Sequence, residues 1–171
     1  PLQVRMRTDP TILIAAMNGA AAGGGLGLAL ACDARIAAPE AKLAAAFFKL
    51  GLSPDGGTTW LLPRLVGNQV TRRFFFNDET WSGEEALEKG AVDEVVSLDD
   101  LISHSVKIAS DWGRWSQLSR NGTKQLLDAS TSTFFQTQLE FEQALIIAAS
   151  QTKEFEEGVS AFLEKRDPVF D

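Results

Sequence analysis

Apolar residues in the first half of the chain form short unbroken runs. Residues 11–17 are apolar after an opening threonine and have the length of a buried strand. Residues 26–31, rich in leucine and alanine, predict a tightly packed helix, and the runs 33–38 and 41–44 predict two more strands. This half of the chain is therefore expected to alternate short strands and helices around a buried core.

The middle of the chain is expected to add helices and one more strand. Threonine residues at 58 and 59 are candidate caps for a helix, and a Ser-Gly-Glu-Glu capping box begins at residue 82. The expected elements are a helix from Thr58 or Thr59 to a stop at Gly67, a helix over 68–76, a short helix from Ser82 to Gly90 and a strand over 91–96.

Beyond Asp99 the apolar positions recur three or four residues apart, which is typical of helices. We therefore expect two domains, an α/β core over residues 1–97 and a helical subdomain over residues 98–171. The residues that carry the helical spacing include Leu101, Ile102, Val106, Ile108, Leu118, Leu126, Leu127, Phe134, Leu139, Leu145 and Ile146.

A glycine-rich turn joins the first predicted strand to the first predicted helix. Gly23, Gly24 and Gly25 allow a sharp turn and a close approach to a ligand, and the first amides of a helix have no carbonyl partner. Such amides bind a phosphate or an oxyanion. The sequence lacks the lysine of a phosphate loop and the glycine spacing of a dinucleotide site. An oxyanion site and a purely structural turn both remain open.

A loop over residues 49–57 carries a single carboxylate, Asp55, within Pro-Asp-Gly-Gly. An aspartate in such a loop is typical of a plain turn. Apolar neighbours such as Phe47 and Trp60 would instead surround the carboxylate, and desolvation raises the pKa of a carboxyl group and makes it a stronger base. Asp55 is therefore either a turn residue or a general base.

Composition excludes several classes of protein. The net charge of −7 argues against a general nucleic-acid surface. Charged residues interrupt every apolar run before about 18 residues, so we expect a cytoplasmic protein with no membrane segment or secretory signal. The single cysteine, Cys32, excludes an intrachain disulfide. The only histidine, His104, has no carboxylate or cysteine at a useful spacing, so we expect a surface role and no metal site.

Three separated motifs resemble the crotonase superfamily, the enoyl-CoA hydratases and isomerases. They are Asn18-Gly19 with the triple glycine and Cys32-Asp33, then Pro54-Asp55-Gly56-Gly57 with Leu61-Leu62-Pro63-Arg64 and Gly67, and finally the closing stretch 157–166. The resemblance implies an α/β fold, a partial ββα superhelix core with a helical C-terminal subdomain that builds a homotrimer or hexamer. It also implies that the first third of a typical member is missing, either as an N-terminal segment or as a separate chain, together with the other oxyanion amide.

The resemblance further implies an acyl-CoA thioester as substrate, with coenzyme A as part of that substrate and no other cofactor. The Gly24 amide would hold an enolate and Asp55 would act as acid and base. The loop looks most like the branch that isomerises ring-epoxide CoA thioesters in phenylacetate degradation, although fatty acid degradation also fits. Contacts to substrate or CoA would come from Gly23, Gly25, Phe47, Pro54, Trp60, Phe162 and Lys165.

Departures from the family favour isomerisation over hydration. Hydratases of the family use two glutamates, and this chain has Gly27 and Phe47 at the matching positions. One base can move a double bond, whereas adding water needs a second acid-base partner. Hydration, with its lyase chemistry, stays an alternative, as does a nucleophilic Asp55. A non-catalytic CoA-binding or assembly subunit is the alternative of another class, and Phe162 and Lys165 equally fit an ordinary amphipathic helix.

Overall fold

The computed structural model describes residues 2–170, and these divide into two compact units. One unit holds the described residues up to Met6 together with Ile12–Ala109, and the other holds Arg7–Thr11 and the residues from Ser110 onward. The expected mixed α/β fold with a helical C-terminal region is confirmed. The units divide inside the helix Leu101–Gly113, whereas the pattern places the domain boundary between residues 97 and 98.

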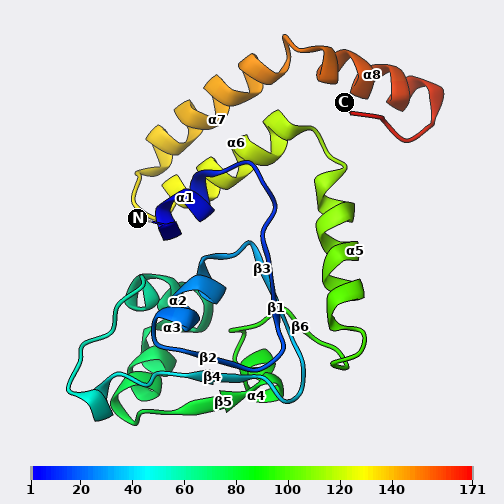
Figure 1. Ribbon diagram of the computed structural model, residues 1–171. Helices are drawn as coiled ribbons and strands as arrows, with labels where there is room; N and C mark the ends of the chain where they lie inside the picture. The colour runs from blue at the N-terminus through cyan, green and yellow to red at the C-terminus, as the bar shows by residue number, and fades with distance from the viewer. Residues whose placement is uncertain (1, 171) are drawn as a thin grey trace. The chain divides into compact units, whose positions relative to one another are not determined.

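The first unit is built on two three-stranded sheets. In one sheet β1, β3 and β6 run parallel, and in the other β4 lies between a parallel β2 and an antiparallel β5. Figure 1 shows the two sheets running in different directions, with the chain passing from β1 into β2 where they meet. The first four strands therefore alternate between the sheets. The strands are β1 (Ile14–Met17), β2 (Ala20–Ala22), β3 (Ala34–Ala37), β4 (Lys42–Ala44), β5 (Thr80–Ser82) and β6 (Glu94–Val95).

Helices pack on both faces of the β1-β3-β6 sheet. The larger core lies on the side of α2 and α3, where Leu26, Leu62 and Phe74 are fully buried. On the other face, Ile36 packs with Leu101 of α5. The helices are α1 (Leu2–Thr8), α2 (Gly24–Ala31), α3 (Thr58–Phe76), α4 (Gly83–Glu88), α5 (Leu101–Gly113), α6 (Gln117–Ala129), α7 (Phe135–Ala149) and α8 (Lys153–Glu164), with a 3-10 turn, η1, at Phe48–Leu50.

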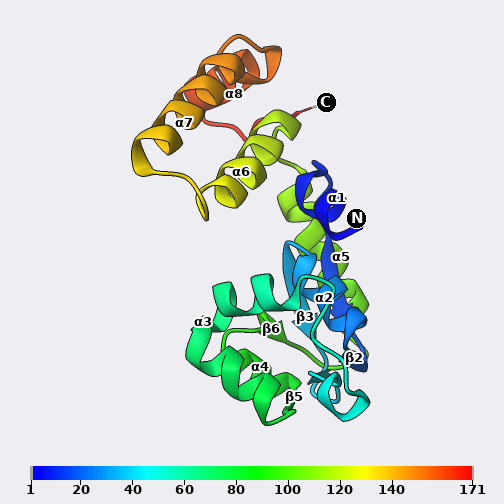
Figure 2. The same cartoon turned by 90° about the vertical axis from the view of Figure 1, so that its left-hand side faces the viewer.

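The predicted break between two helices lies inside α3. Gly67 has φ 80° and ψ 161°, outside the helical region, and the helix runs in two directions on either side of the break (Figure 2). The predicted threonine cap is wrong, because Gly57, in the left-handed region at φ 81°, is the residue before the helix. Only glycine adopts that conformation without strain, so the helix begins directly after the Gly-Gly pair.

Several short elements differ from the sequence pattern. The predicted strand over 91–96 is reduced to β6, because Ala91 and Val92 are buried in a turn that hydrogen bonds to the Ala86 carbonyl. Strand β2 is three alanines, which have low strand propensity and pair only because β4 lies alongside. The Ser82 capping box is confirmed, with the Glu85 carboxylate accepting from the Ser82 amide at 2.8 Å.

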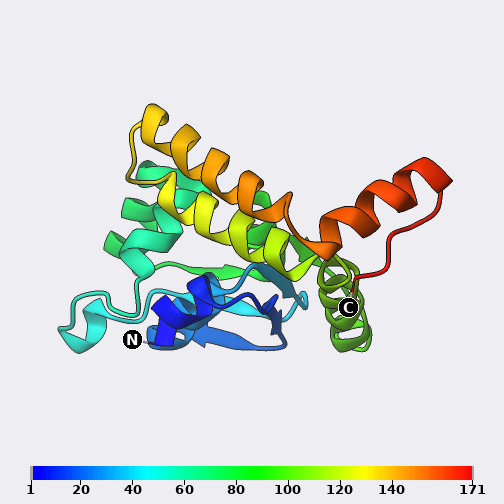
Figure 3. The same ribbon diagram turned by 90° about the horizontal axis from the view of Figure 1, so that it is seen from above.

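In the second unit, α6 and α7 lie side by side (Figure 3). Leu145 of α7 faces Gly122 of α6, where a Cβ would lie 3.6 Å from its side chain, an ordinary contact distance. Residues 7–11 attach to α6, where Arg120 donates to the Pro10 carbonyl at 3.1 Å and Lys124 to the Thr11 carbonyl at 2.9 Å. Among residues 2–170, no helix has both the length and the apolar character needed to cross a bilayer.

Candidate active site

The glycine turn ends at the start of α2, as the pattern predicts. Gly23, at φ 51°, precedes the helix, and its carbonyl accepts the first helical hydrogen bond from the Gly27 amide at 3.2 Å. The amides of Gly24, Gly25 and Leu26 therefore have no carbonyl acceptor within the helix. With the positive end of the helix dipole beside them, they suit an anionic oxygen.

The loop with Asp55 ends at the start of α3. The Asp55 carbonyl accepts two hydrogen bonds from Thr58, one from its amide at 3.1 Å and one from its hydroxyl at 2.8 Å. Thr58 is fully buried, although Asp55 itself is exposed. The backbone of Asp55 is therefore held from the helix side of the loop.

The two segments touch through glycine residues. A Cβ built on Gly56 would lie 3.5 Å from the Gly27 Cα and 3.6 Å from the Gly24 Cα. Gly24 and Gly27 are three residues apart and so share one face of α2. The residue after Asp55 therefore packs on the first turn of the helix whose amides are free.

Phe47 lies under the glycine turn. Its ring is 3.7 Å from where a Gly23 Cβ would be, and its centroid is 6.3 Å from that of Phe75. The side chain is buried in the larger core. Phe47 thus supports the turn from below and offers no group that could transfer a proton.

Pro54 and Trp60 flank Asp55 along the chain. Pro54 is half-buried and Trp60 is exposed, with the guanidinium of Arg64 stacked 3.6 Å from its ring centroid. Arg64 also donates to the Trp60 carbonyl at 2.7 Å. This cation beside the Asp55 loop was not predicted, although its spacing of four residues from Trp60 on a helix is the signal for such a pair.

The structure does not show the expected desolvation of Asp55. The residue is exposed, and so is Trp60, which was expected to surround the carboxylate. The nearby Leu50 and Leu52 are exposed as well. The apolar runs around Asp55 bury other residues instead, such as Leu61 and Leu62.

His104 was expected to have no carboxylate partner, and this is wrong. Its Nε2 lies 2.7 Å from the Glu94 Oε2. The sequence separates the two residues by ten positions, and β6 brings them together. Among residues 2–170, no group of three or more histidine, cysteine, aspartate or glutamate side chains is arranged to hold a metal ion.

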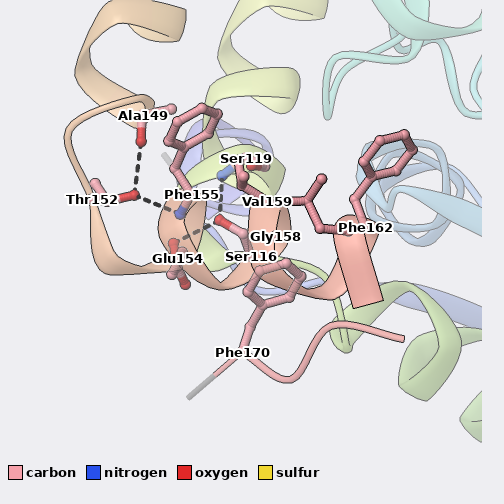
Figure 4. Close-up of a pocket in the computed structure, with 11 residues that line it drawn as sticks. Ser116, Ser119, Ala149, Thr152, Glu154, Phe155, Gly158, Val159, Phe162 and Phe170 are labelled. Atoms are coloured by element: carbon pink, nitrogen blue, oxygen red, sulfur yellow. Dashed lines mark hydrogen bonds between the residues drawn. The ribbon is translucent and has the colours of Figure 1, made fainter. Parts of the chain in front are cut away.

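Phe162 and Lys165 belong to the second unit. Phe162 is exposed and lines a pocket of about 410 Å³ with Phe155 and Phe170 (Figure 4). Lys165 lies just beyond α8, in the left-handed region at φ 55°, and ends the helix. Phe162 therefore lies in the last turn of α8, whereas the chain leaves the helix at Lys165.

The C-terminal turn after α8 is held by charge. Arg166 donates to both Glu157 oxygens, at 2.6 and 2.9 Å, and the Val169 amide donates to the same carboxylate at 2.9 Å. The Arg166 hydrogen bonds, followed by the Val169 amide, lower the pKa of Glu157 to about 2. The hydrogen bonds that Arg166 donates to Glu157 and Glu164 raise the pKa of Arg166.

Known proteins resemble the chain over its whole length. A family model described as enoyl-CoA hydratase/isomerase matches residues 1–171. The 1,2-epoxyphenylacetyl-CoA isomerase of Escherichia coli is 38% identical over 170 residues, covering 99% of this chain and 65% of the relative. The 2,3-dehydroadipyl-CoA hydratase of the same organism is 34% identical over 169 residues, covering 99% and 66%.

Solved structures agree with this match. An enoyl-CoA hydratase from Polaromonas superposes with a TM-score of 0.93 at 32% identity, covering 99% of this chain and 66% of that one. A protein from Mycobacterium abscessus, described as a putative enoyl-CoA hydratase/isomerase, has a TM-score of 0.94 at 30% identity. The chain thus spans just under two thirds of the length of the relatives described here. It belongs to the enoyl-CoA hydratase/isomerase family, the crotonase superfamily.

Proposed function

We propose that this chain carries the acid-base part of an acyl-CoA isomerase site, with Gly24 as oxyanion donor and Asp55 as proton carrier. The observation that carries the proposal is the packing of Gly56 on Gly24 and Gly27. It puts the loop that bears the carboxylate on the first turn of the helix that bears the free amides. A base next to an oxyanion donor is the arrangement that enolate chemistry needs.

The proposed reaction needs one base. Asp55 takes a proton from the carbon beside the thioester carbonyl, and the bonding electrons move onto the thioester oxygen to form an enolate. The Gly24 amide donates a hydrogen bond to that oxygen as its negative charge grows. The electrons then return, the double bond shifts, and Asp55 delivers the proton to a carbon farther along the acyl chain. The carboxylate ends in its starting state.

Isomerisation is preferred because this site has Asp55 as its acid-base side chain and lacks the two glutamates that hydratases of the family use. Residue 27 is glycine and residue 47 is a buried phenylalanine. Neither can activate a water molecule or protonate the product. The similarity to the 1,2-epoxyphenylacetyl-CoA isomerase of Escherichia coli supports a ring-epoxide CoA thioester as the substrate.

We further propose that the substrate and its CoA part contact residues beside Gly24 and Asp55 and residues at the end of α8. Gly23 and Gly25 flank the oxyanion amide, and Pro54 and Trp60 flank the base. Phe162 and Lys165 suit a nucleotide, because an exposed aromatic ring can stack on a base and an ammonium can meet a phosphate. A homotrimer would allow these two residues to serve the site of a neighbouring subunit.

The test is the variant Asp55→Asn, which keeps the shape of the side chain but cannot accept a proton. Solvent deuterium exchange into a bound acyl-CoA, followed by mass spectrometry, should fall by at least about 100-fold, the scale expected for a lost general base. Asp99→Asn, at an exposed position outside the loop, is the matched control and should exchange at the wild-type rate. Unchanged exchange in Asp55→Asn would make Asp55 a turn residue.

Hydration is the second candidate, because the 34% identical relative is named as a hydratase. The deciding comparison is the rate of water addition to crotonyl-CoA against the rate of double-bond migration in a 3-enoyl-CoA. Faster hydration would reverse our ranking. Binding of CoA thioesters without either reaction would instead indicate a CoA-binding or assembly subunit.

A further inference from the structure

Gly27 makes the closest approach between α2 and the Asp55 loop. A Cβ at this residue would lie 2.5 Å from the carbonyl oxygen of Gly56 and 3.0 Å from its Cα. Real Cβ atoms do not come that near to a backbone oxygen, so one of the two segments would have to move. The glycine at residue 27 is therefore a condition for the loop to sit where it does.

Other glycines of the same turn are not under this constraint. A Cβ on Gly19, Gly24 or Gly25 would meet no atom within 4 Å. The steric demand thus falls on the one glycine that faces Gly56. The need for glycine at residue 27 therefore comes from its contact with the Asp55 loop and not from the packing of the helix in general.

The contacts nearest to Asp55 lie on its α3 side. There Gly56 packs on α2, and Thr58 holds the Asp55 carbonyl with its buried hydroxyl at 2.8 Å. Farther back along the loop, the Leu52 amide donates to the Phe47 carbonyl at 3.1 Å, while the Leu50 and Leu52 side chains are exposed. The position of the Asp55 backbone therefore depends on the Gly27–Gly56 contact and on Thr58.

From these contacts we propose that Gly27 and Gly56 are positioning residues for Asp55. The proposal rests on the proposed function and deepens it. Gly27 keeps the Asp55 loop on the oxyanion turn because it has no side chain, and a side chain at position 27 of this chain displaces the loop.

The test compares Gly27→Ala with Gly83→Ala. Gly83 is a matched control, because a Cβ there would also lie 2.5 Å from a backbone oxygen, that of Ala38, and neither residue belongs to the site. Overpacking should lower the melting temperature of both variants by about 2 to 10 °C. Only Gly27→Ala should lose proton exchange, by at least about 100-fold in kcat with KM changed less than about threefold, because small displacements of a catalytic group have effects of that size.

A second readout needs no substrate. Backbone NMR shifts of residues 55–58 should move in Gly27→Ala and stay in place in Gly83→Ala. If Gly27→Ala does not fold, the pair Thr58→Val and Thr58→Ser replaces it. The valine variant removes the hydroxyl that holds Asp55 and should lower kcat, whereas the serine variant keeps the hydroxyl and should restore it.

The outcomes separate the two proposals. Wild-type kcat together with unmoved shifts in Gly27→Ala would overturn the positioning role. Equal losses of exchange in Gly27→Ala and Gly83→Ala would overturn it as well, since the effect would then follow stability alone. Absence of exchange in the wild type would count against the proposed function. The NMR shifts of residues 55–58 would still test whether Gly27 positions the loop.

Discussion

Arg35 ties the centre of the parallel sheet together. Its side chain is only 6% exposed and donates to the carbonyls of Ala91 and Cys32, at 3.1 and 2.9 Å, and to the Asp93 carboxylate at 3.0 Å. Asp93 in turn accepts from the Arg35 amide at 2.7 Å. One buried guanidinium therefore links β3 to the turns on either side of it, and no shorter side chain can reach all three acceptors.

We expect Arg35→Met to lower the free energy of unfolding by about 3 kcal/mol, because it leaves the buried Ala91 carbonyl and the half-buried Cys32 carbonyl without their donors and removes the charge partner of Asp93. Urea unfolding followed by circular dichroism measures this. Arg72→Met, at an exposed position of α3, is the control and should change stability by less than about 0.5 kcal/mol. A loss as small as that of the control would mean that water replaces the lost donors.

At the same scale, motif spacing identified the residues of the candidate site better than it identified their surroundings. Gly24 begins α2 and Asp55 lies in the loop before α3, as predicted. The roles of Gly27, Gly56 and Thr58 in holding the loop were not predicted, because each depends on a contact across the fold. The exposure of Asp55 was also missed, since sequence neighbours on a loop need not be neighbours in space.

At the scale of elements, the C-terminal turn after α8 depends on the ionised Glu157. The folded pKa of this carboxyl, about 2, lies below the ordinary 4.5. The ionised group therefore contributes its stabilisation fully above about pH 4.5 and loses it as the pH falls towards 2. The turn should stay closed at mildly acidic pH.

We expect the amide of Val169 to report this titration by NMR. At about pH 3.5 its chemical shift should still be close to the neutral value, because a carboxyl with a pKa of about 2 remains mostly ionised there. The titration should vanish in Glu157→Gln and persist in Glu164→Gln, which leaves the Val169 acceptor intact. A midpoint near the ordinary 4.5 would show that the turn is open in solution.

At the scale of the whole molecule, α7 leaves an apolar face without cover in this chain. No residue of α7 is buried. The Ile146 side chain is 70% exposed, and that of Phe134, just before the helix, is 85% exposed. Leu145, by contrast, is half-buried and lies against Gly122 of α6. Exposed apolar surface of this kind marks an interaction site.

We expect the protein to assemble as a homotrimer, or as a pair of trimers, through this helical part. Light scattering at micromolar concentration should give a mass near three or six times that of the chain. Ile146→Glu should shift the mass towards the monomer, because a charge on the apolar face would be buried in the assembly. Gln143→Glu, on an exposed polar position of the same helix, should leave the mass unchanged. A wild-type monomer would remove both the trimer and a CoA site shared between subunits.

Local patterns in the sequence were enough to predict strands at β1, β3 and β4, a helix at α2, the glycine turn before it, the Ser82 capping box and the break at Gly67. These depend on residues within one or two turns of each other, where propensity and capping act. Tertiary structure alone decided that three alanines form β2, that Glu94 meets His104 and that Gly56 packs on Gly27. Each of these joins segments far apart along the chain, and such contacts depend on how the whole core packs, which no short stretch of sequence encodes.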